Sequence, residues 1–225
     1  MPLHPQVSAV LEQMRATGGP PLEEMSVEQA RAGHLRAAES LGGAPEEVAS
    51  AVDIAAGPLR LRAYRPRGAG PDRLLGGVLY LHGGGWVTCD LDTHDRLCRS
   101  LANRSGAAVV AVDYRRAPEH PFPAAVDDGL EALAWLRAHA AEVGVDPARL
   151  AVAGDSAGGN LAAVIARRDR EAGGAPPLLL QVLIVPITDG AMDSPSYAEN
   201  AQGFYLTRAG MGWYWGHYLA GADPL

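Results

Sequence analysis

Leu150-Ala151-Val152-Ala153-Gly154-Asp155-Ser156-Ala157-Gly158 is the stretch of sequence that decides the fold. The four apolar residues 150–153 are typical of a buried strand, and the residues after Ser156 follow a helical pattern. Glycines stand two positions before and two positions after Ser156, where a Cβ would crowd a sharp turn from strand to helix. The segment therefore predicts a nucleophile elbow, in which the Ser156 hydroxyl is held exposed above a sheet.

A second glycine-rich turn follows another apolar run. Residues 78–81 lead into His82-Gly83-Gly84-Gly85-Trp86, a loop of the kind whose backbone N–H groups bind a developing oxyanion. We expect the His82 ring to support this loop by hydrogen bonding rather than to act as a base. The predicted oxyanion hole is made by the backbone N–H groups of Gly83, Gly84, Gly85 and Ala157. Together the two turns predict acyl-transfer chemistry.

A serine hydroxyl needs a base to act as a nucleophile near neutral pH, and the usual general-base histidine is not evident after Ser156. One rearranged triad, Ser156 with Asp189 and His217, has the chain order serine, acid, histidine. His217 lies among aromatic residues on a predicted helix, from which it would have to reach over the turn. That alternative stays open. The other histidines are predicted to be surface or turn residues: His4, His34, His94, His120 and His139.

Elsewhere strands and helices alternate along the chain. The first 48 residues are predicted to be largely helical with a break at 18–21, and two short runs around Gly57-Pro58 predict a β-hairpin. The later strands are continuous apolar runs, the pattern of a mostly parallel sheet with helices on both faces. These predicted strands are 77–81, 107–112, 150–153 and 178–185, and the main predicted helices are 26–41, 93–105, 124–143 and 157–171.

The composition is that of a single globular domain. The chain has 225 residues, of which 48% are hydrophobic and 20% charged, and its formal net charge is −7. The acidic balance, with no basic stripe, argues against nucleic acid as a partner, and no apolar run is long enough for membrane insertion. We expect a cytoplasmic protein without a signal peptide, a metal or another cofactor, in which Cys89 and Cys98 are reduced thiols.

Three segments resemble the hormone-sensitive-lipase-like group of α/β-hydrolases, which are bacterial carboxylesterases and lipases. They are the glycine-rich loop 82–86, the highly specific run 113–124 (DYRRAPEHPFPA) and the serine turn 154–162 (GDSAGGNLA). Arg116 stands where the group usually has leucine. The resemblance implies the α/β-hydrolase fold, with a core over residues 49–188 and a helical cap made of residues 1–48 and 189–225.

The resemblance also implies parts that are not evident in this chain. In this group an acid lies in an Asp-Pro-Leu-type turn after the next strand, and a histidine follows the strand beyond that. Asp223-Pro224-Leu225 directly follows the cap region, so we interpret it as the Asp-Pro after the cap. We therefore expect a C-terminally truncated chain without the catalytic acid, the histidine or the last strands of the sheet. Residues 178–185 would then form an exposed, uncharged edge, and the chain alone would be a poor esterase.

The sequence thus predicts a serine carboxylesterase that hydrolyses short- to medium-chain carboxylic esters through an acyl-enzyme on Ser156. Its partner would be a small apolar ester, and an oligomer is compatible with the sequence. The alternative is a non-catalytic protein that binds a small ligand on the same fold, as the similar plant gibberellin receptors do without a complete triad.

Overall fold

A six-stranded sheet forms the centre of the molecule. In the computed structural model, which describes residues 3–221, the strand order is β1-β2-β4-β3-β5-β6. β2 is antiparallel to both of its neighbours, β1 and β4. β3 is parallel to β4 and to β5, and β5 is parallel to β6. The sheet confirms the predicted fold class, whereas the predicted turn at 223–225 lies outside the described residues. The strands are β1 Ser50–Ala56, β2 Leu59–Arg65, β3 Leu75–Leu81, β4 Ala108–Asp113, β5 Val145–Asp155 and β6 Leu180–Ile184.

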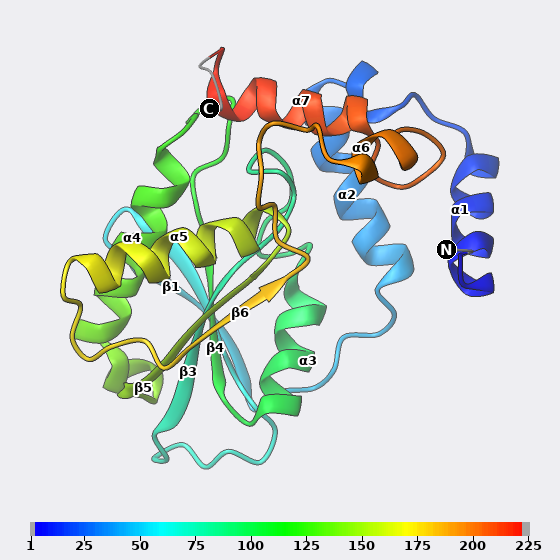
Figure 1. Ribbon diagram of the computed structural model, residues 1–225. Coiled ribbons are helices and arrows are strands. Elements are labelled where there is room, and N and C mark those ends of the chain that lie inside the picture. Colours follow the sequence, from blue (N-terminus) through cyan, green and yellow to red (C-terminus); the bar gives the residue numbers. More distant parts are fainter. Residues whose placement is uncertain (1–2, 222–225) are drawn as a thin grey trace.

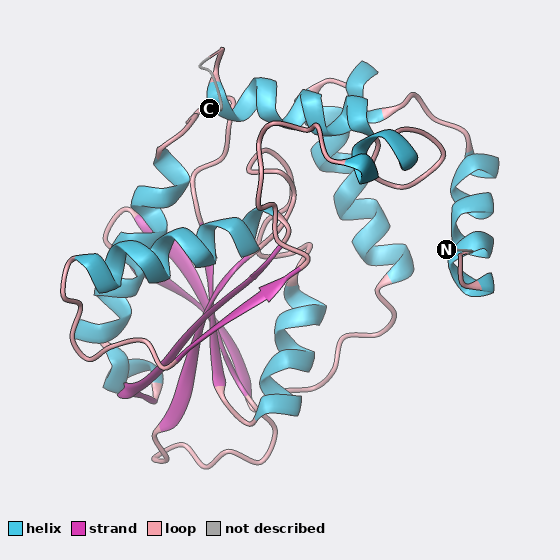
Figure 2. Ribbon diagram, viewed as in Figure 1, coloured by secondary structure: helices cyan, strands magenta, loops and turns pink. Residues whose placement is uncertain are grey.

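Helices cover both faces of the sheet and one of its ends (Figures 1 and 2). α3 packs on one face, and α4 and α5 pack on the other. α1, α2, α6 and α7 gather at the end of the sheet toward which the arrow of β6 points. The helices are α1 Pro5–Thr17, α2 Val27–Leu41, α3 Asp95–Ser105, α4 Ala124–Ala138, α5 Ala157–Glu171, α6 Pro195–Glu199 and α7 Arg208–Leu219.

Each face of the sheet has its own hydrophobic core, because alternate residues of a strand point to opposite faces. In β3, Leu79 packs in the core that includes Leu133 of α4 and Leu161 of α5. Its neighbour Tyr80 belongs to the other core, which includes Cys98 of α3. The inner strands are therefore buried on both faces, as their continuous apolar runs predict. Cys98 and Cys89 are both buried free thiols, which confirms the prediction of unpaired cysteines.

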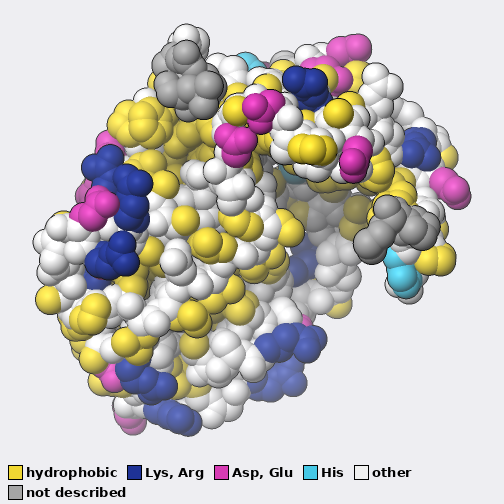
Figure 3. All heavy atoms as spheres, viewed as in Figure 1, with side chains coloured by type: hydrophobic (Ala, Val, Ile, Leu, Met, Phe, Trp, Pro, Cys, Tyr) yellow, Lys and Arg dark blue, Asp and Glu magenta, His cyan; other side chains and the backbone are white. Residues whose placement is uncertain are grey.

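β6 differs from the inner strands because it lies at an edge of the sheet. All five of its residues are exposed, and Val185, which follows it, is 78% exposed. This agrees with the expectation that residues 178–185 form an uncharged, exposed edge. In the space-filling view, hydrophobic side chains are spread over the face on which β6 lies (Figure 3).

Local signals explain where several elements begin and end. Ser26 begins α2 with a capping box: its Oγ accepts from the Gln29 N–H at 3.2 Å, and Gln29 Oε1 accepts from the Ser26 N–H at 2.9 Å. The helix predicted over 124–143 ends earlier, at Ala138, and a 3-10 turn follows. Gly144, at φ 67°, then adopts the left-handed backbone that lets β5 begin well before residue 150.

The strand register brings the two glycine-rich turns together. β3 lies next to β5, and Leu81 at the end of β3 pairs with Gly154. The residues that follow this pair, His82 and Asp155, are therefore neighbours at this end of the sheet. Ligand sites in open α/β sheets form beyond the carboxyl ends of the strands, so the candidate site is expected at this end, beneath α2, α6 and α7.

Candidate active site

Ser156 lies at a strained turn between β5 and α5. Its φ of 52° and ψ of −117° fall outside the regions that L-residues ordinarily occupy, and strain of this kind is concentrated at functional sites. Backbone packing requires glycine on either side. A Cβ on Gly154 would overlap the Gly158 carbonyl, and a Cβ on Gly158 would overlap the carbonyls of Leu81 and His82. The Gly-x-Ser-x-Gly spacing is therefore a steric requirement of this turn.

Main-chain hydrogen bonds hold the serine turn against the end of β6. The Ser156 N–H donates to the Ile184 carbonyl at 2.9 Å, and the Ser156 carbonyl accepts from the Ile187 N–H at 3.2 Å. The Asn160 side chain donates to the Ile187 carbonyl at 3.0 Å. These bonds fix the position of Ser156 relative to the segment that follows β6.

The glycine-rich loop predicted to bind an oxyanion, residues 82–88, lies beside this turn and is called the oxyanion loop below. Three of its consecutive carbonyl groups are held by hydrogen bonds. The His82 carbonyl accepts from the Tyr114 hydroxyl at 2.8 Å. The Gly83 carbonyl accepts from His82 Nδ1 at 2.8 Å. The Gly84 carbonyl accepts from the Thr88 N–H at 2.8 Å and from the Thr88 hydroxyl at 2.9 Å.

These carbonyl contacts determine where the N–H groups of the loop point. In a trans peptide the carbonyl and the next N–H point in opposite directions. The Gly84 and Gly85 N–H groups therefore point away from the residues that hold the carbonyls, and neither has an acceptor within residues 3–221. Gly83 differs from them, because its N–H donates to Asp155 Oδ1 at 3.0 Å. Ala157 is the first residue of α5, where helical N–H groups lack intrahelical acceptors.

The His82 ring is packed inside the loop. It is buried and stacks on Tyr114, with 4.2 Å between the ring centroids. Burial, together with the neighbouring His94, lowers the pKa of His82 to about 3, so the ring is neutral near pH 7. A neutral imidazole with Nδ1–H directed at the Gly83 carbonyl is suited to supporting the loop.

The structure also brings together two residues that the sequence did not connect with the site. His94 lies in a turn as predicted, but its side chain is only 13% exposed and its Nε2 is 3.2 Å from Asp155 Oδ1. Burial raises the pKa of Asp155, but hydrogen bonds from His94 and Tyr80 outweigh it and keep the pKa below its ordinary value. Strand alternation could have indicated that Asp155 faces α3. Ala153 and Tyr80 lie on the α3 side of the sheet, and alternate residues of a strand share a face, so Asp155 is expected on that side too.

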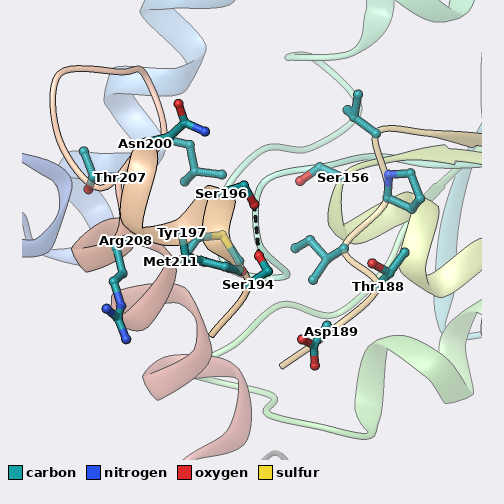
Figure 4. Close-up of a pocket in the computed structure, with 14 residues that line it drawn as sticks. Ser156, Thr188, Asp189, Ser194, Ser196, Tyr197, Asn200, Thr207, Arg208 and Met211 are labelled. Atoms are coloured by element: carbon teal, nitrogen blue, oxygen red, sulfur yellow. Dashed lines mark hydrogen bonds between the residues drawn. The ribbon is translucent and has the colours of Figure 1, made fainter. Parts of the chain in front are cut away.

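A cavity of about 380 Å³ opens beside Ser156 (Figure 4). Ser156 lies on one side of it, together with Thr188 and Asp189 from the segment after β6. The other side is formed by α6, by α7 and by the loop between them. The residues on that side are Ser194, Ser196, Tyr197, Asn200, Leu206, Thr207, Arg208 and Met211.

The structure places two members of the rearranged triad at this cavity and not the third. Ser156 and Asp189 both line it, whereas His217 does not. The His217 ring packs edge-on against Trp213, with 4.4 Å between the centroids, and Asp189 Oδ1 accepts from the Ala191 N–H at 3.0 Å. Within residues 3–221, no histidine is hydrogen-bonded to the Ser156 hydroxyl.

A second cavity, of about 400 Å³, lies between the N-terminal helices and α7. Leu206 lines both cavities and forms part of the wall between them. Tyr214 also lines the second cavity and lies directly on Gly85, where any Cβ would overlap its ring. Its other walls include Met14, Leu22, Met25 and Tyr205, so it is largely apolar. Figure 3 shows the surface hollowed below the segment that carries α6 and α7, between that segment and the core.

Arg31 of α2 connects the N-terminal helices to the site. Its Nε donates to the Val87 carbonyl at 2.9 Å, and one terminal nitrogen donates to the Ala117 carbonyl at 3.0 Å. Both terminal nitrogens bind the Glu119 carboxylate at 2.7 Å. Val87 belongs to the oxyanion loop, so α2 is attached to the wall of the site by a bidentate ion pair and two backbone contacts.

A mostly parallel sheet, a serine at a strained strand-to-helix turn and a glycine-rich loop beside it are the features that define the α/β-hydrolase class. Residues 78–225 match a family described by the α/β hydrolase fold. The chain belongs to this family, in the hormone-sensitive-lipase-like group of α/β-hydrolases.

The proteins similar to this chain include mycobacterial esterases and a hydrolase from a lake metagenome. Esterase LipI of Mycobacterium tuberculosis is 52% identical over 151 residues, which cover 67% of this chain and 47% of LipI. Carboxylesterase NlhH of the same species is 50% identical over 146 residues, which cover 65% of this chain and 46% of NlhH. The crystal structure of LAE6, an α/β hydrolase enzyme from the metagenome of Lake Arreo, Spain, matches with a TM-score of 0.92 at 41% identity, over 99% of this chain and 72% of LAE6.

The chain spans about half the length of these two curated relatives. None of the helices within residues 3–221 has the length and apolar character needed to cross a bilayer.

Proposed function

We propose that this protein is a serine carboxylesterase in which Ser156 is the nucleophile. The observation that carries the proposal is the strained Ser156 backbone, at φ 52°, beside a loop whose Gly84 and Gly85 N–H groups have no acceptor within residues 3–221. A fixed hydroxyl next to unused amide donors is the arrangement that acyl transfer requires. The esterase names of LipI and NlhH support the same reaction class.

In the proposed reaction, Ser156 Oγ attacks the ester carbonyl carbon while a general base accepts the hydroxyl proton. The oxyanion of the tetrahedral intermediate accepts hydrogen bonds from the N–H groups of Gly84, Gly85 and Ala157, the last at the positive end of α5. The bond to the alcohol oxygen then breaks, the alcohol leaves with a proton, and the acyl group remains on Ser156. Water attacks this acyl-enzyme and releases the carboxylic acid.

Two assignments refine the predicted site. Gly83 stays in the oxyanion loop but does not contact the oxyanion, because its N–H donates to Asp155. His82 supports the loop through the Gly83 carbonyl and does not serve as the base, because it is buried and its pKa is about 3.

We further assign the helical segments 1–48 and 189–225 to a cap over the core 49–188. The substrate would lie between cap and core, in the two cavities of about 380 and 400 Å³. Volumes of this size accommodate small ligands, and the apolar walls of the second cavity favour a short- to medium-chain aliphatic group.

The test is covalent labelling of the full-length protein with a fluorophosphonate, together with hydrolysis of p-nitrophenyl butyrate. Ser156→Ala should abolish both signals. Ser194→Ala is the matched control, because Ser194 lines the same cavity and should keep both. Labelling that persists in Ser156→Ala would refute the assignment. Ester binding without labelling or turnover in the parent protein would favour the alternative, a non-catalytic ligand-binding protein.

A further inference from the structure

The Asp155 carboxylate lies between the serine turn and the oxyanion loop. Asp155 directly precedes Ser156, and its Oδ1 accepts the Gly83 N–H at 3.0 Å and the Tyr80 hydroxyl at 2.7 Å. His94 Nε2 lies 3.2 Å from Oδ1 and 3.4 Å from Oδ2. The carboxylate does not line the cavity beside Ser156. It is therefore placed to hold groups of the protein rather than to contact a substrate.

This contact joins two segments that the sheet no longer holds together. β3 and β5 are paired as far as Leu81 and Gly154, after which one segment enters the oxyanion loop and the other enters the serine turn. Beyond that pair, Gly83 and Asp155 form the one hydrogen bond between the loop and the turn within residues 3–221. A Cβ on Gly83 would overlap the Asp155 carboxylate, so the two groups are also in direct contact.

The partners of Asp155 restrict how the carboxylate can move. Tyr80 comes from β3, His94 from the turn before α3, and Gly83 from the oxyanion loop. His94 is itself held, because its Nδ1 lies 3.0 Å from the Thr93 hydroxyl. Two groups outside the loop, the Tyr80 hydroxyl and the His94 ring, thus hold the carboxylate, and the carboxylate in turn holds one peptide unit of the loop.

We propose that Asp155 is a positioning residue that sets the distance between the Ser156 hydroxyl and the oxyanion-binding amides, with His94 and Tyr80 holding its carboxylate in place. The proposal rests on the proposed function and deepens it. Oxyanion donors act over about 2.7–3.1 Å, and a displacement of about 1 Å can reduce a rate ~100-fold. Because the oxyanion develops only in the transition state, the loss should fall on kcat rather than on KM.

The experiment compares Asp155→Leu and Asp155→Asn with a matched buried control, Asp169→Asn. Asp169 of α5 is paired with Arg137 of α4 and contacts neither the oxyanion loop nor the serine turn. For each full-length variant, hydrogen exchange of the segment 82–88 is measured by mass spectrometry, and kcat and KM are measured with p-nitrophenyl butyrate. Asp155→Asn keeps the shape of the side chain and serves if Asp155→Leu does not fold.

We expect Asp155→Leu to speed amide exchange in the segment 82–88 and to lower kcat about 100-fold while KM stays within about 3-fold. Asp155→Asn should show a smaller change in the same direction, and Asp169→Asn should show neither change. The His94 contact has its own check. His94→Gln can still donate an N–H to Asp155 and should keep most of the activity that His94→Ala loses.

The exchange measurement does not depend on catalysis, so it separates the two proposals. Unchanged exchange in both folded Asp155 variants would overturn the positioning role whatever their activity. Faster exchange with unchanged kcat would overturn it as well, provided that Ser156→Ala abolishes turnover. If Ser156→Ala retains turnover, the proposed function fails, and the exchange result alone decides whether Asp155 holds the loop.

Discussion

At Gly158, α5 touches the main chain of β3 with no space for a side chain. A Cβ at this position would overlap the Leu81 and His82 carbonyl oxygens, which belong to a paired strand and to the start of the oxyanion loop. Neither carbonyl can move without disturbing the sheet or the loop. Glycine is therefore required here by close approach of two backbones, and one residue links the stability of the fold to the geometry of the site.

Gly158→Ala should therefore destabilise the protein by about 3 kcal/mol, because a new methyl group must displace backbone atoms in a packed core. Urea unfolding followed by circular dichroism measures the change. Gly212→Ala is the matched control, since Gly212 lies in α7 with no atom within 4 Å of the added Cβ. That change should be stabilising by about 0.5–1 kcal/mol. A Gly158→Ala protein as stable as the parent would contradict the close approach.

The residues that sequence reasoning located are those whose role depends on local spacing. Ser156 and its flanking glycines are separated by two positions along the chain, so the pattern is visible without a structure. Asp155 and His94 are 61 residues apart and meet because of the register between β3 and β5 and the position of α3. The same reason explains Gly83: its place in the loop was predictable, but its N–H acceptor depends on a distant strand.

At the scale of single elements, Arg31 attaches α2 to the wall of the site. Two of the Arg31 contacts are with backbone carbonyls, at Val87 and Ala117, and the third is a bidentate pair with Glu119. The Glu119 side chain is 50% exposed, yet the hydrogen bonds from Arg31 lower its pKa to about 2. The contribution of the Arg31–Glu119 pair to the attachment of α2 therefore depends on pH.

The sign of that link follows from the pKa of Glu119. The folded pKa, about 2, lies below the reference value of 4.5, so the pair stabilises the fold fully above about pH 4.5 and loses that effect as pH falls toward 2. The difference in unfolding free energy between the parent and Glu119→Gln should therefore shrink over this range. In an Arg31→Gln background, the same Glu119→Gln comparison should lose this pH dependence. Urea unfolding across the pH series checks both, and a difference that persists at pH 2 would contradict the pairing.

Element types were predictable from periodicity and capping, whereas element ends were less so. The Ser26 capping box fixes the start of α2, and its two residues, Ser26 and Gln29, are only three positions apart in the sequence. The end of α4 was misplaced because its apolar period continues to Val143, while the backbone changes to a 3-10 turn before Gly144. The antiparallel pairing of β2 with β4 joins segments that are far apart in the sequence, so no local pattern predicts it.

At the scale of the whole molecule, the two edges of the sheet are unequal. β1, at one edge, has two charged or polar residues, Ser50 and Asp53, and its neighbour β2 carries arginines. β6, at the other edge, has Gln181 as its single polar residue, and its side chains are exposed. An uncharged strand edge with free backbone groups readily pairs with another such edge.

Expressed as residues 1–225, the chain should therefore self-associate with increasing concentration, and Val182→Lys should reduce that association by placing a charge on β6. Val52→Lys is the matched control, because Val52 is an exposed valine on β1 at the opposite edge. Size-exclusion chromatography with light scattering over a concentration series measures the effect. An equal response to both substitutions would show that β6 is not the contact.

The attachment of Arg31 has a consequence for how molecules enter and leave the site. Moving α2 outward would break its contacts with Val87 and Ala117 and would pull on the oxyanion loop itself. α6, which lines the cavity beside Ser156, has no buried residue within its span Pro195–Glu199, so moving it would break fewer packed contacts. In the proposed reaction, product should therefore leave on the α6 side, while Ser156 and the oxyanion loop stay in place for the next cycle.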